Sequence, residues 1–120
     1  MIATVLLIFD KGNLICLSCF FADIPIAEGK LDDWIALIYD NPKGFALTRT
    51  MPGFISAETA IMTDENGQAS FLLWEKWEKQ EDFAHYNQQP DRLEDSEFMQ
   101  QFFACVGGAP KMGFVRQMSM

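Results

Sequence analysis

Two apolar segments joined by an Asn-Gly turn constrain the fold more than any other part of this sequence. Residues 54–62 alternate between two sets of side chains, and residues 69–77 are almost continuously apolar. The linking sequence is Thr63-Asp64-Glu65-Asn66-Gly67, whose Asn-Gly pair readily takes the positive φ angles of a tight turn. The pattern predicts a central β-hairpin, which the chain enters through the turn at Pro52-Gly53.

A second hairpin is predicted at the beginning of the chain. Residues 2–9 and 14–22 are both strongly apolar, and Asp10-Lys11-Gly12-Asn13 supplies turn residues between them. In residues 14–22 neither set of alternate positions is polar, and a strand of this kind is normally covered on both faces. The chain should therefore build a sheet with partners on its two sides.

Helical spacing marks the remaining elements. Leu31, Trp34, Ile35 and Ile38 repeat at the spacing of a helix with one apolar face. Residues 42–50 are predicted to form a second short helix, because Asn41 suits its cap and Pro42 its first position.

The last third of the chain predicts two further helices and a strand. A helix over 79–87 should bury Phe83 and Tyr86. A last helix, capped by Asp95 or Ser96, has the stripe Met99, Phe102, Phe103 and Val106, and residues 112–118 should form a closing strand.

This order predicts an α+β fold of the ferredoxin-like type, a split β-α-β arrangement with an antiparallel sheet and an extra N-terminal strand, in one domain over residues 1–120. Helices would cover one face of the sheet only. Leaving ten apolar side chains of the other face in water would forgo roughly 15–30 kcal/mol, at about 1.5–3 each. We therefore expect a homodimer with its sheets face to face, the alternative being a monomer with a sparsely covered sheet.

Charge and cysteine content limit the partners and the compartment. The formal net charge of −8 disfavours nucleic acid and anionic membranes as partners. The first residues lack the features of an export signal, and three cysteines are an odd number, so we expect a reducing cytoplasm and free thiols. Cys16 and Cys19 have the C-x-x-C spacing, but on a strand their side chains point to opposite faces, which favours packing over redox or metal chemistry.

The second half of the chain contains a series of short motifs: Pro52-Gly53-Phe54, Glu58, the turn at Asp64, the run from Phe71 to Trp77, Phe83 and His85. In their order and spacing these motifs resemble the dimeric α+β barrel superfamily and its antibiotic biosynthesis monooxygenase type. The pair Glu75-x-Trp77 and the distance from Trp77 to His85 match that family. The resemblance covers residues 14–120.

The resemblance implies a dimer with a small apolar pocket between sheet and helices in each subunit. It suggests a monooxygenase that oxidises a small quinol- or anthrone-like aromatic with O2 and without a metal or flavin. Two alternatives on the same scaffold stay open. One is a non-catalytic dimer that binds a small apolar ligand or has a stress-related or regulatory role, and the other is an isomerase or decarboxylase.

His85 is the candidate catalytic base, because it is the only histidine and histidine titrates near neutral pH. A surface histidine is the alternative interpretation. Tyr86 follows it on the predicted helix and is a weaker candidate for contact with the substrate.

Three further residues are candidates for the wall of the pocket. Trp74 and Trp77 lie three positions apart on a strand and therefore on opposite faces, so one of them could line the pocket. Arg116 could pair with a substrate oxyanion, or it could form an ion pair with Glu58 or Glu75 instead.

Overall fold

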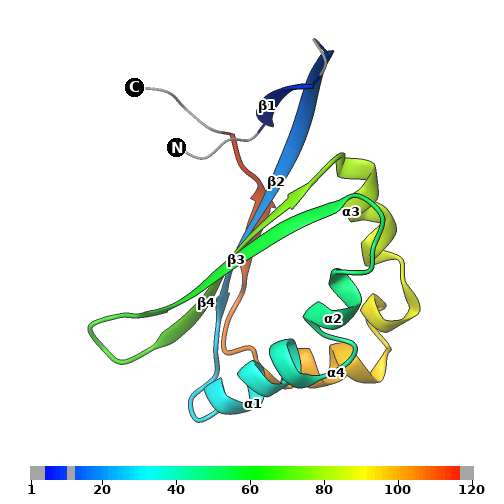
Figure 1. The fold of residues 1–120 in the computed structure, drawn as a ribbon. Helices are drawn as coiled ribbons and strands as arrows, with labels where there is room; N and C mark the ends of the chain where they lie inside the picture. The colour runs from blue at the N-terminus through cyan, green and yellow to red at the C-terminus, as the bar shows by residue number, and fades with distance from the viewer. Residues whose placement is uncertain (1–4, 11–12, 117–120) are drawn as a thin grey trace.

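A computed structural model describes the backbone of residues 5–10 and 13–116 and the side chains of residues 18–116. The sheet runs through the molecule with the helices on one side of it (Figure 1). In chain order the elements are β1 (Val5–Asp10), β2 (Asn13–Pro25), α1 (Leu31–Ile35), η1 (Ala36–Asp40), α2 (Phe45–Thr48), β3 (Phe54–Thr63), β4 (Ala69–Trp77), α3 (Gln80–Asn87), η2 (Pro90–Arg92), α4 (Glu97–Cys105) and β5 (Lys111–Phe114).

The five strands form one antiparallel sheet in the order β1-β2-β4-β3, and β5 also pairs with β2. β1 pairs with the first part of β2, from Asn13 to Ser18, and β5 pairs with its later part, from Phe20 to Asp23. Leaving β1 aside, the order β5-β2-β4-β3 is that of the ferredoxin-like fold. The predicted α+β fold with an extra N-terminal strand is therefore confirmed.

Both predicted hairpins are present. In the central one, β3 and β4 pair from Phe54 with Trp77 to Thr63 with Ala69. The carboxylate of Asp64 accepts hydrogen bonds from the backbone N–H groups of Asn66 and Gln68, and Gly67 has the expected positive φ of 81°. In the first hairpin, residues 2–4 of the predicted strand lie outside the described residues.

The first helical region differs from its prediction in two ways. The α-helix ends at Ile35 and continues as one turn of π-helix, η1, which widens the turn. As a result Leu37 is buried beside Trp34 and Ile38, whereas Ile35, predicted on the buried stripe, is 37% exposed. The prediction assumed 3.6 residues per turn throughout, so it did not include the change in which side chains face the core that the wider π-helical turn produces.

The second short helix is also shorter than predicted. It covers Phe45–Thr48 rather than residues 42–50, and it follows Gly44 instead of being capped by Asn41. Asn41 Oδ1 accepts a hydrogen bond from the Lys43 backbone N–H, 2.8 Å away, and so closes a local turn. Asn41 therefore forms a turn before the helix rather than the cap of the helix.

Helix α4 begins as predicted but buries different residues. Ser96 caps it by accepting a hydrogen bond from the Met99 backbone N–H at 3.1 Å. Phe98 and Cys105 are its buried residues, and Phe103, which the sequence placed on the buried stripe, is 45% exposed. The closing strand covers Lys111–Phe114, so Val115 and Arg116 of the predicted strand lie beyond it, and residues 117–118 of that prediction lie outside the described residues.

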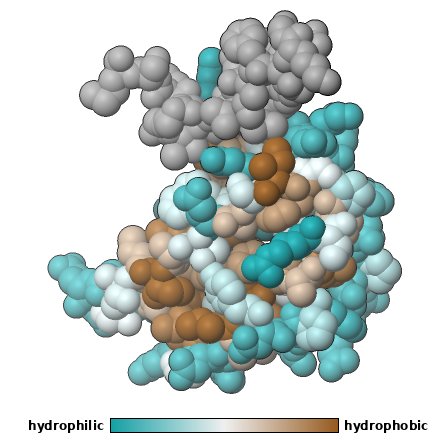
Figure 2. Space-filling model, in the orientation of Figure 1, coloured by the Kyte–Doolittle hydropathy of each residue, from teal (hydrophilic) through white to brown (hydrophobic). Residues whose placement is uncertain are grey.

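The main core lies between the helices and one face of the sheet. Phe20, Ala22 and Ile24 of β2 and Phe71 of β4 pack there against Trp34, Leu37 and Ile38. A smaller cluster, Met51, Trp77 and Tyr86, lies under α3. In the view of Figure 2, hydrophobic patches lie on the visible surface, with hydrophilic residues around them.

The opposite face of the sheet carries Phe21, Leu72 and Trp74, and the rings of Phe21 and Trp74 lie 5.2 Å apart. Glu58 and Lys76 share this face, so it is more mixed than the sequence suggested. Within the described ranges, 5–10 and 13–116, no helix has the length and hydrophobicity that a membrane span requires.

Candidate functional site

A cavity of about 610 Å³ lies between the sheet and the helices, where the family resemblance implied a pocket. Its floor is formed by alternate residues of two neighbouring strands: Phe20, Ala22 and Ile24 of β2, and Phe71, Leu73 and Glu75 of β4. Most of the rest of the wall comes from helices α1, α2, α3 and α4, the short turns η1 and η2, and Met112 of β5. Most side chains of this lining are apolar, and only a few are polar.

Among the described residues that line this cavity, Glu75 is the one with an acidic side chain. It is only 3% exposed, because strand alternation places it on the helix-covered face with Phe71 and Leu73. Burial raises the pKa of its carboxyl group from 4.5 to about 7, against a smaller lowering by a hydrogen bond from Trp77 and by the charge of Arg92. At neutral pH this group therefore exists both as acid and as carboxylate.

Trp77 holds Glu75 in place. Its indole is fully buried, and Nε1 donates a hydrogen bond of 3.3 Å to Glu75 Oε1. The ring also lies 5.2 Å from the ring of Tyr86 on α3. Among the described side chains, none donates a hydrogen bond to the other carboxyl oxygen, Oε2.

Tyr86, Thr48 and Arg92 form a polar cluster in the same wall. The Tyr86 hydroxyl lies 2.8 Å from Thr48 Oγ1 and accepts a hydrogen bond of 2.8 Å from Arg92 Nε. Burial raises the pKa of Tyr86, although the charge of Arg92 opposes this effect. Tyr86 is therefore a neutral phenol that is fixed from two sides.

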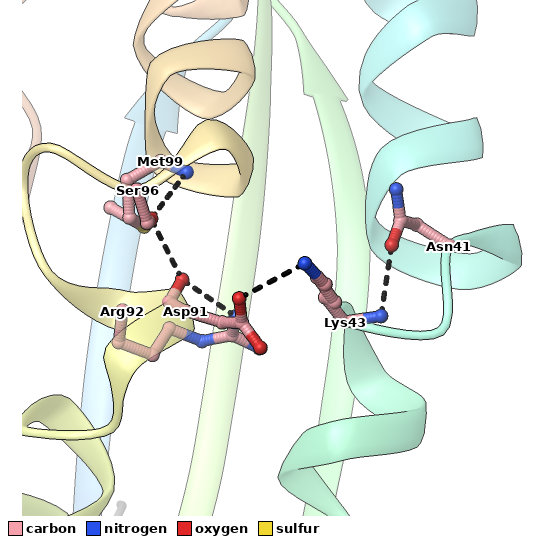
Figure 3. Close-up of polar contacts among 6 residues, drawn as sticks. All are labelled: Asn41, Lys43, Asp91, Arg92, Ser96 and Met99. Atoms are coloured by element: carbon pink, nitrogen blue, oxygen red, sulfur yellow. Dashed lines mark hydrogen bonds and ion pairs between the residues drawn. The ribbon is translucent and has the colours of Figure 1, made fainter.

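Arg92 is fixed by its neighbours along the whole guanidinium group. Nη2 donates to the Gly44 carbonyl at 3.1 Å, and the guanidinium carbon lies 4.3 Å from the centroid of the Phe98 ring. The adjacent loop is fixed as well: Ser96 Oγ donates to the Asp91 carbonyl at 3.1 Å, and Lys43 Nζ lies 3.2 Å from Asp91 Oδ1 (Figure 3). The positively charged guanidinium group of Arg92 is therefore held in a fixed position near Glu75 and Tyr86.

Of the residues predicted from the sequence, Tyr86 lines the cavity, and Trp77 lies behind it in contact with Glu75 and Tyr86. His85 lies on the exposed side of α3, where its Nε2 is 3.3 Å from Gln89 Nε2, and it is not in the cavity wall.

Trp74 and Arg116 lie away from the cavity. Trp74 is on the opposite face of the sheet, as its spacing from Trp77 required. Arg116 is exposed after the end of β5, and the ion pairs among the described side chains, Lys30–Asp33 and Lys43–Asp91, do not include it. The ion pair predicted from Arg116 to Glu58 or Glu75 is therefore absent.

Sequence reasoning missed Glu75, Thr48 and Arg92 as residues of the site. Glu75 gave a usable signal: it is the charged member of an otherwise apolar alternating set with Phe71, Leu73 and Trp77. Arg92 and Thr48 gave none, because they reach the cavity from a short 3₁₀ turn and a four-residue helix. Within the described part of the chain, no three His, Cys, Asp or Glu side chains are grouped as metal ligands would be.

The fold is shared with several solved structures at low sequence identity. SnoaB, a cofactor-independent oxygenase from Streptomyces nogalater, has a TM-score of 0.61 and 15% identity, over 84% of this chain and 95% of that one. The monooxygenase of the gene ActVA-Orf6 from Streptomyces coelicolor, in complex with the ligand nanaomycin D, has a TM-score of 0.62 and 17% identity, over 88% and 90%. Rv0793 from Mycobacterium tuberculosis has a TM-score of 0.63 and 12% identity, over 87% and 97%.

The search of curated proteins gave no match. The family model of the antibiotic biosynthesis monooxygenases matches residues 20–94, which is more than half of the 120 residues. This segment runs from Phe20 at the floor of the cavity to the turn that carries Arg92. The chain therefore belongs to the antibiotic biosynthesis monooxygenase family.

Proposed function

We propose that this protein is a cofactor-independent oxygenase that oxidises a small quinol- or anthrone-like aromatic compound in the cavity between sheet and helices. One observation carries the proposal: Glu75, a buried carboxyl group with a pKa of about 7, lies in an apolar cavity of about 610 Å³. A base of this kind is poised to remove a weakly acidic proton near neutral pH. The shared fold of SnoaB, itself a cofactor-independent oxygenase, supports the choice of reaction.

The chemistry needs only a base and molecular oxygen. Glu75 takes a proton from the CH₂ group of an anthrone, and the resulting carbanion is electron-rich enough to reduce O2. A C–O bond forms, and the peroxide is protonated. Loss of water then leaves a carbonyl group, so one CH₂ and one O2 give one C=O and one H2O.

Two other residues and the apolar wall support this base in the proposal. Trp77 orients the carboxyl group through its hydrogen bond to Oε1. The positive charge of Arg92 favours the carboxylate form of Glu75 and also holds the Tyr86 phenol. The apolar wall keeps bulk water away from the carbanion, which protects it from simple reprotonation.

Oxygen uptake with an anthrone tests the proposed function. With purified protein in buffer containing a metal chelator, we expect uptake of one O2 per anthrone and formation of the matching quinone. The measurement is an oxygen electrode together with the absorbance of the product. If the protein binds anthrone saturably but takes up no oxygen above the protein-free rate, the proposal fails, and a non-catalytic ligand-binding role replaces it.

The His85→Ala variant in the same assay decides between the two candidate bases. His85 remains the base predicted from the sequence, whereas Glu75 is the group in the cavity wall. We expect His85→Ala to retain far more activity than Glu75→Gln. The reverse order would assign proton removal to His85.

We also propose that two copies associate through the open face of the sheet that carries Phe21, Leu72 and Trp74. The support is the partly exposed aromatic pair, Phe21 and Trp74, whose burial is favourable. Analytical ultracentrifugation should give twice the 13.7 kDa of one chain, and Trp74→Glu should shift the mass toward a single chain. A single-chain mass for the unmodified protein at micromolar concentration would contradict the dimer.

A further inference from the structure

Three residues in the wall of the cavity are exposed to solvent. They are Asn87 at the end of α3, Phe103 of α4 and Met112 of β5. The other described residues of the wall are buried or partly buried. Solvent therefore reaches the wall of the cavity mainly at these three side chains.

Met112 is exposed although its side chain is on the helix-covered face of the sheet. Met112 pairs with Ala22 of β2, which is buried under the helices, and paired residues of neighbouring strands share a face. Phe114, two residues further along β5, shares this face, and its ring lies 5.5 Å from the ring of Phe83 on α3. Helix α3 thus covers the end of β5, whereas Met112 stays 56% exposed. The helical layer therefore ends before it reaches Met112.

Phe103 is exposed on the side of α4 that faces the cavity. It lies four residues after Met99 and three before Val106, so the three side chains share one side of the helix. All three line the cavity, but Met99 and Val106 are partly buried and Phe103 is 45% exposed. Phe103 is thus exposed because little covers it, and not because it points away from the cavity.

The loop from α4 to β5 connects these two exposed residues and has a fixed backbone at its beginning. The Gly107 N–H donates a hydrogen bond of 2.9 Å to the Pro25 carbonyl, and Val106 forms a β-bridge with Ile26. Val106 and Pro110 of this loop also line the cavity. Because the main chain is held here, the width of an opening beside it depends on side chains.

The floor of the cavity leads from Met112 to Glu75. Met112 pairs with Ala22, and Ala22 pairs with Leu73 of β4, so the three residues form one row across three strands. All three line the cavity, and Glu75 follows Leu73 by two residues on the same face of β4. A molecule that passes Met112 therefore moves along this row toward Glu75.

We propose that Phe103 and Met112 form the entrance of the cavity and control the rate at which apolar molecules enter and leave it. Their side chains face the cavity from α4 and from β5, and both are exposed where the helical layer ends. The inference concerns access only, so it goes beyond the proposed function and holds whether or not the bound molecule is oxidised.

The binding kinetics of a fluorescent dye test the entrance. N-phenyl-1-naphthylamine is neutral and apolar, and its emission rises in an apolar site, so stopped-flow fluorescence under nitrogen gives its association and dissociation rate constants. Met112→Trp places a larger side chain at the entrance, and entry and exit cross the same barrier. Both rate constants should therefore fall by the same factor, about fivefold, and Kd should stay at its wild-type value.

Three results would overturn the inference. The first is a wild-type protein that does not bind the dye, because a cavity with this entrance should admit it. The second is no change in either rate constant of Met112→Trp. The third is a fall in one rate constant alone, which would make Met112 a contact of the bound dye and not a part of its path.

The variant Phe103→Ala tests the same entrance in the opposite direction. Removal of the ring widens the opening, so both rate constants should rise together, and this result also covers the case in which Met112→Trp does not fold. Met62→Trp is the matched control: Met62 lies on β3, is 47% exposed and is not in the cavity wall. Its rate constants should equal those of wild type, and a fall as large as in Met112→Trp would contradict the inference.

The dye measurements separate access to the cavity from the reaction in it. Unchanged rate constants in both entrance variants, together with oxygen uptake by the wild type, would remove the entrance and keep the proposed oxygenase. Matched changes in both rate constants without any oxygen uptake would keep the entrance and remove the oxygenase.

Discussion

Replacing Glu75 with Gln should lower the rate of oxygen uptake by roughly 10²–10⁴-fold, which is the usual contribution of a general base. Gln has nearly the same shape and can still accept the hydrogen bond from Trp77, so the fold should persist. The initial rate with an anthrone is the measurement. Glu78→Gln, at an exposed position just beyond β4, is the matched control and should leave the rate unchanged.

The pH dependence of the wild-type rate tests the same assignment. Only the carboxylate accepts a proton, and the pKa of Glu75 is about 7, so kcat/KM should rise with pH and reach half of its maximum near pH 7. A rate that stays constant from pH 5 to pH 8 would contradict Glu75 as the base.

As the pH rises, the free energy of unfolding should fall while kcat/KM rises. The folded pKa of Glu75, about 7, is above its unfolded value of 4.5, so folding retains a proton that the unfolded chain releases between these pH values. The free energy of unfolding should therefore fall as pH rises through this window, by roughly 3 kcal/mol at 1.36 per pKa unit. Urea denaturation at pH 4.5 and pH 8 should show this loss in the wild type and a smaller one in Glu75→Gln.

Replacing Arg92 with Met should destabilise the protein by roughly 2–4 kcal/mol, because hydrogen bonds from a charged donor and a cation–π contact are lost together. The groups left behind are the Tyr86 hydroxyl, the Gly44 carbonyl and the face of the Phe98 ring. Urea denaturation at constant pH measures this effect.

The same variant should move the acidic limb of the rate profile to higher pH. The charge of Arg92 lowers the pKa of Glu75, so its removal raises that pKa further. Arg92→Lys separates the two effects: it keeps the charge and should hold the limb near pH 7, but it lacks the planar fork and should still lose stability. A limb that does not move in Arg92→Met would show that the charge has no influence on the base.

The strands and their pairing could be predicted from the sequence because their signals are local and strong. The Asn66-Gly67 turn sets the register of the central hairpin, and strand alternation places Trp74 and Trp77 on opposite faces. The helix surfaces were less predictable. One turn of π-helix over Ala36–Asp40 exchanges Leu37 for Ile35 on the buried side, and periodicity does not reveal such a turn.

The candidate site was only partly predictable. Tyr86 and Trp77 were among the expected residues, but the acid-base group was sought in His85 because histidine as a residue type titrates near neutral pH. In the structure, burial brings Glu75 to the same titration range, and burial of a single side chain is not visible in a sequence. Arg92 and Thr48 are part of the site because three short segments, η2, α2 and the turn at Gly44, come together there.

The way in which β2 is paired has a consequence for how the chain tolerates truncation. Two strands from opposite ends of the chain pair with the same edge of β2. β1 pairs with Asn13–Ser18, and β5 pairs with Phe20–Asp23. A chain cleaved before Asn13 would keep the residues of the cavity but would lose β1, so the main-chain N–H and C=O groups of Asn13–Ser18 that pair with β1 would be left without partners. The segment Asn13–Ser18 of β2 would then replace β1 as the outer edge of the sheet, and this edge would be open to strand addition by another molecule.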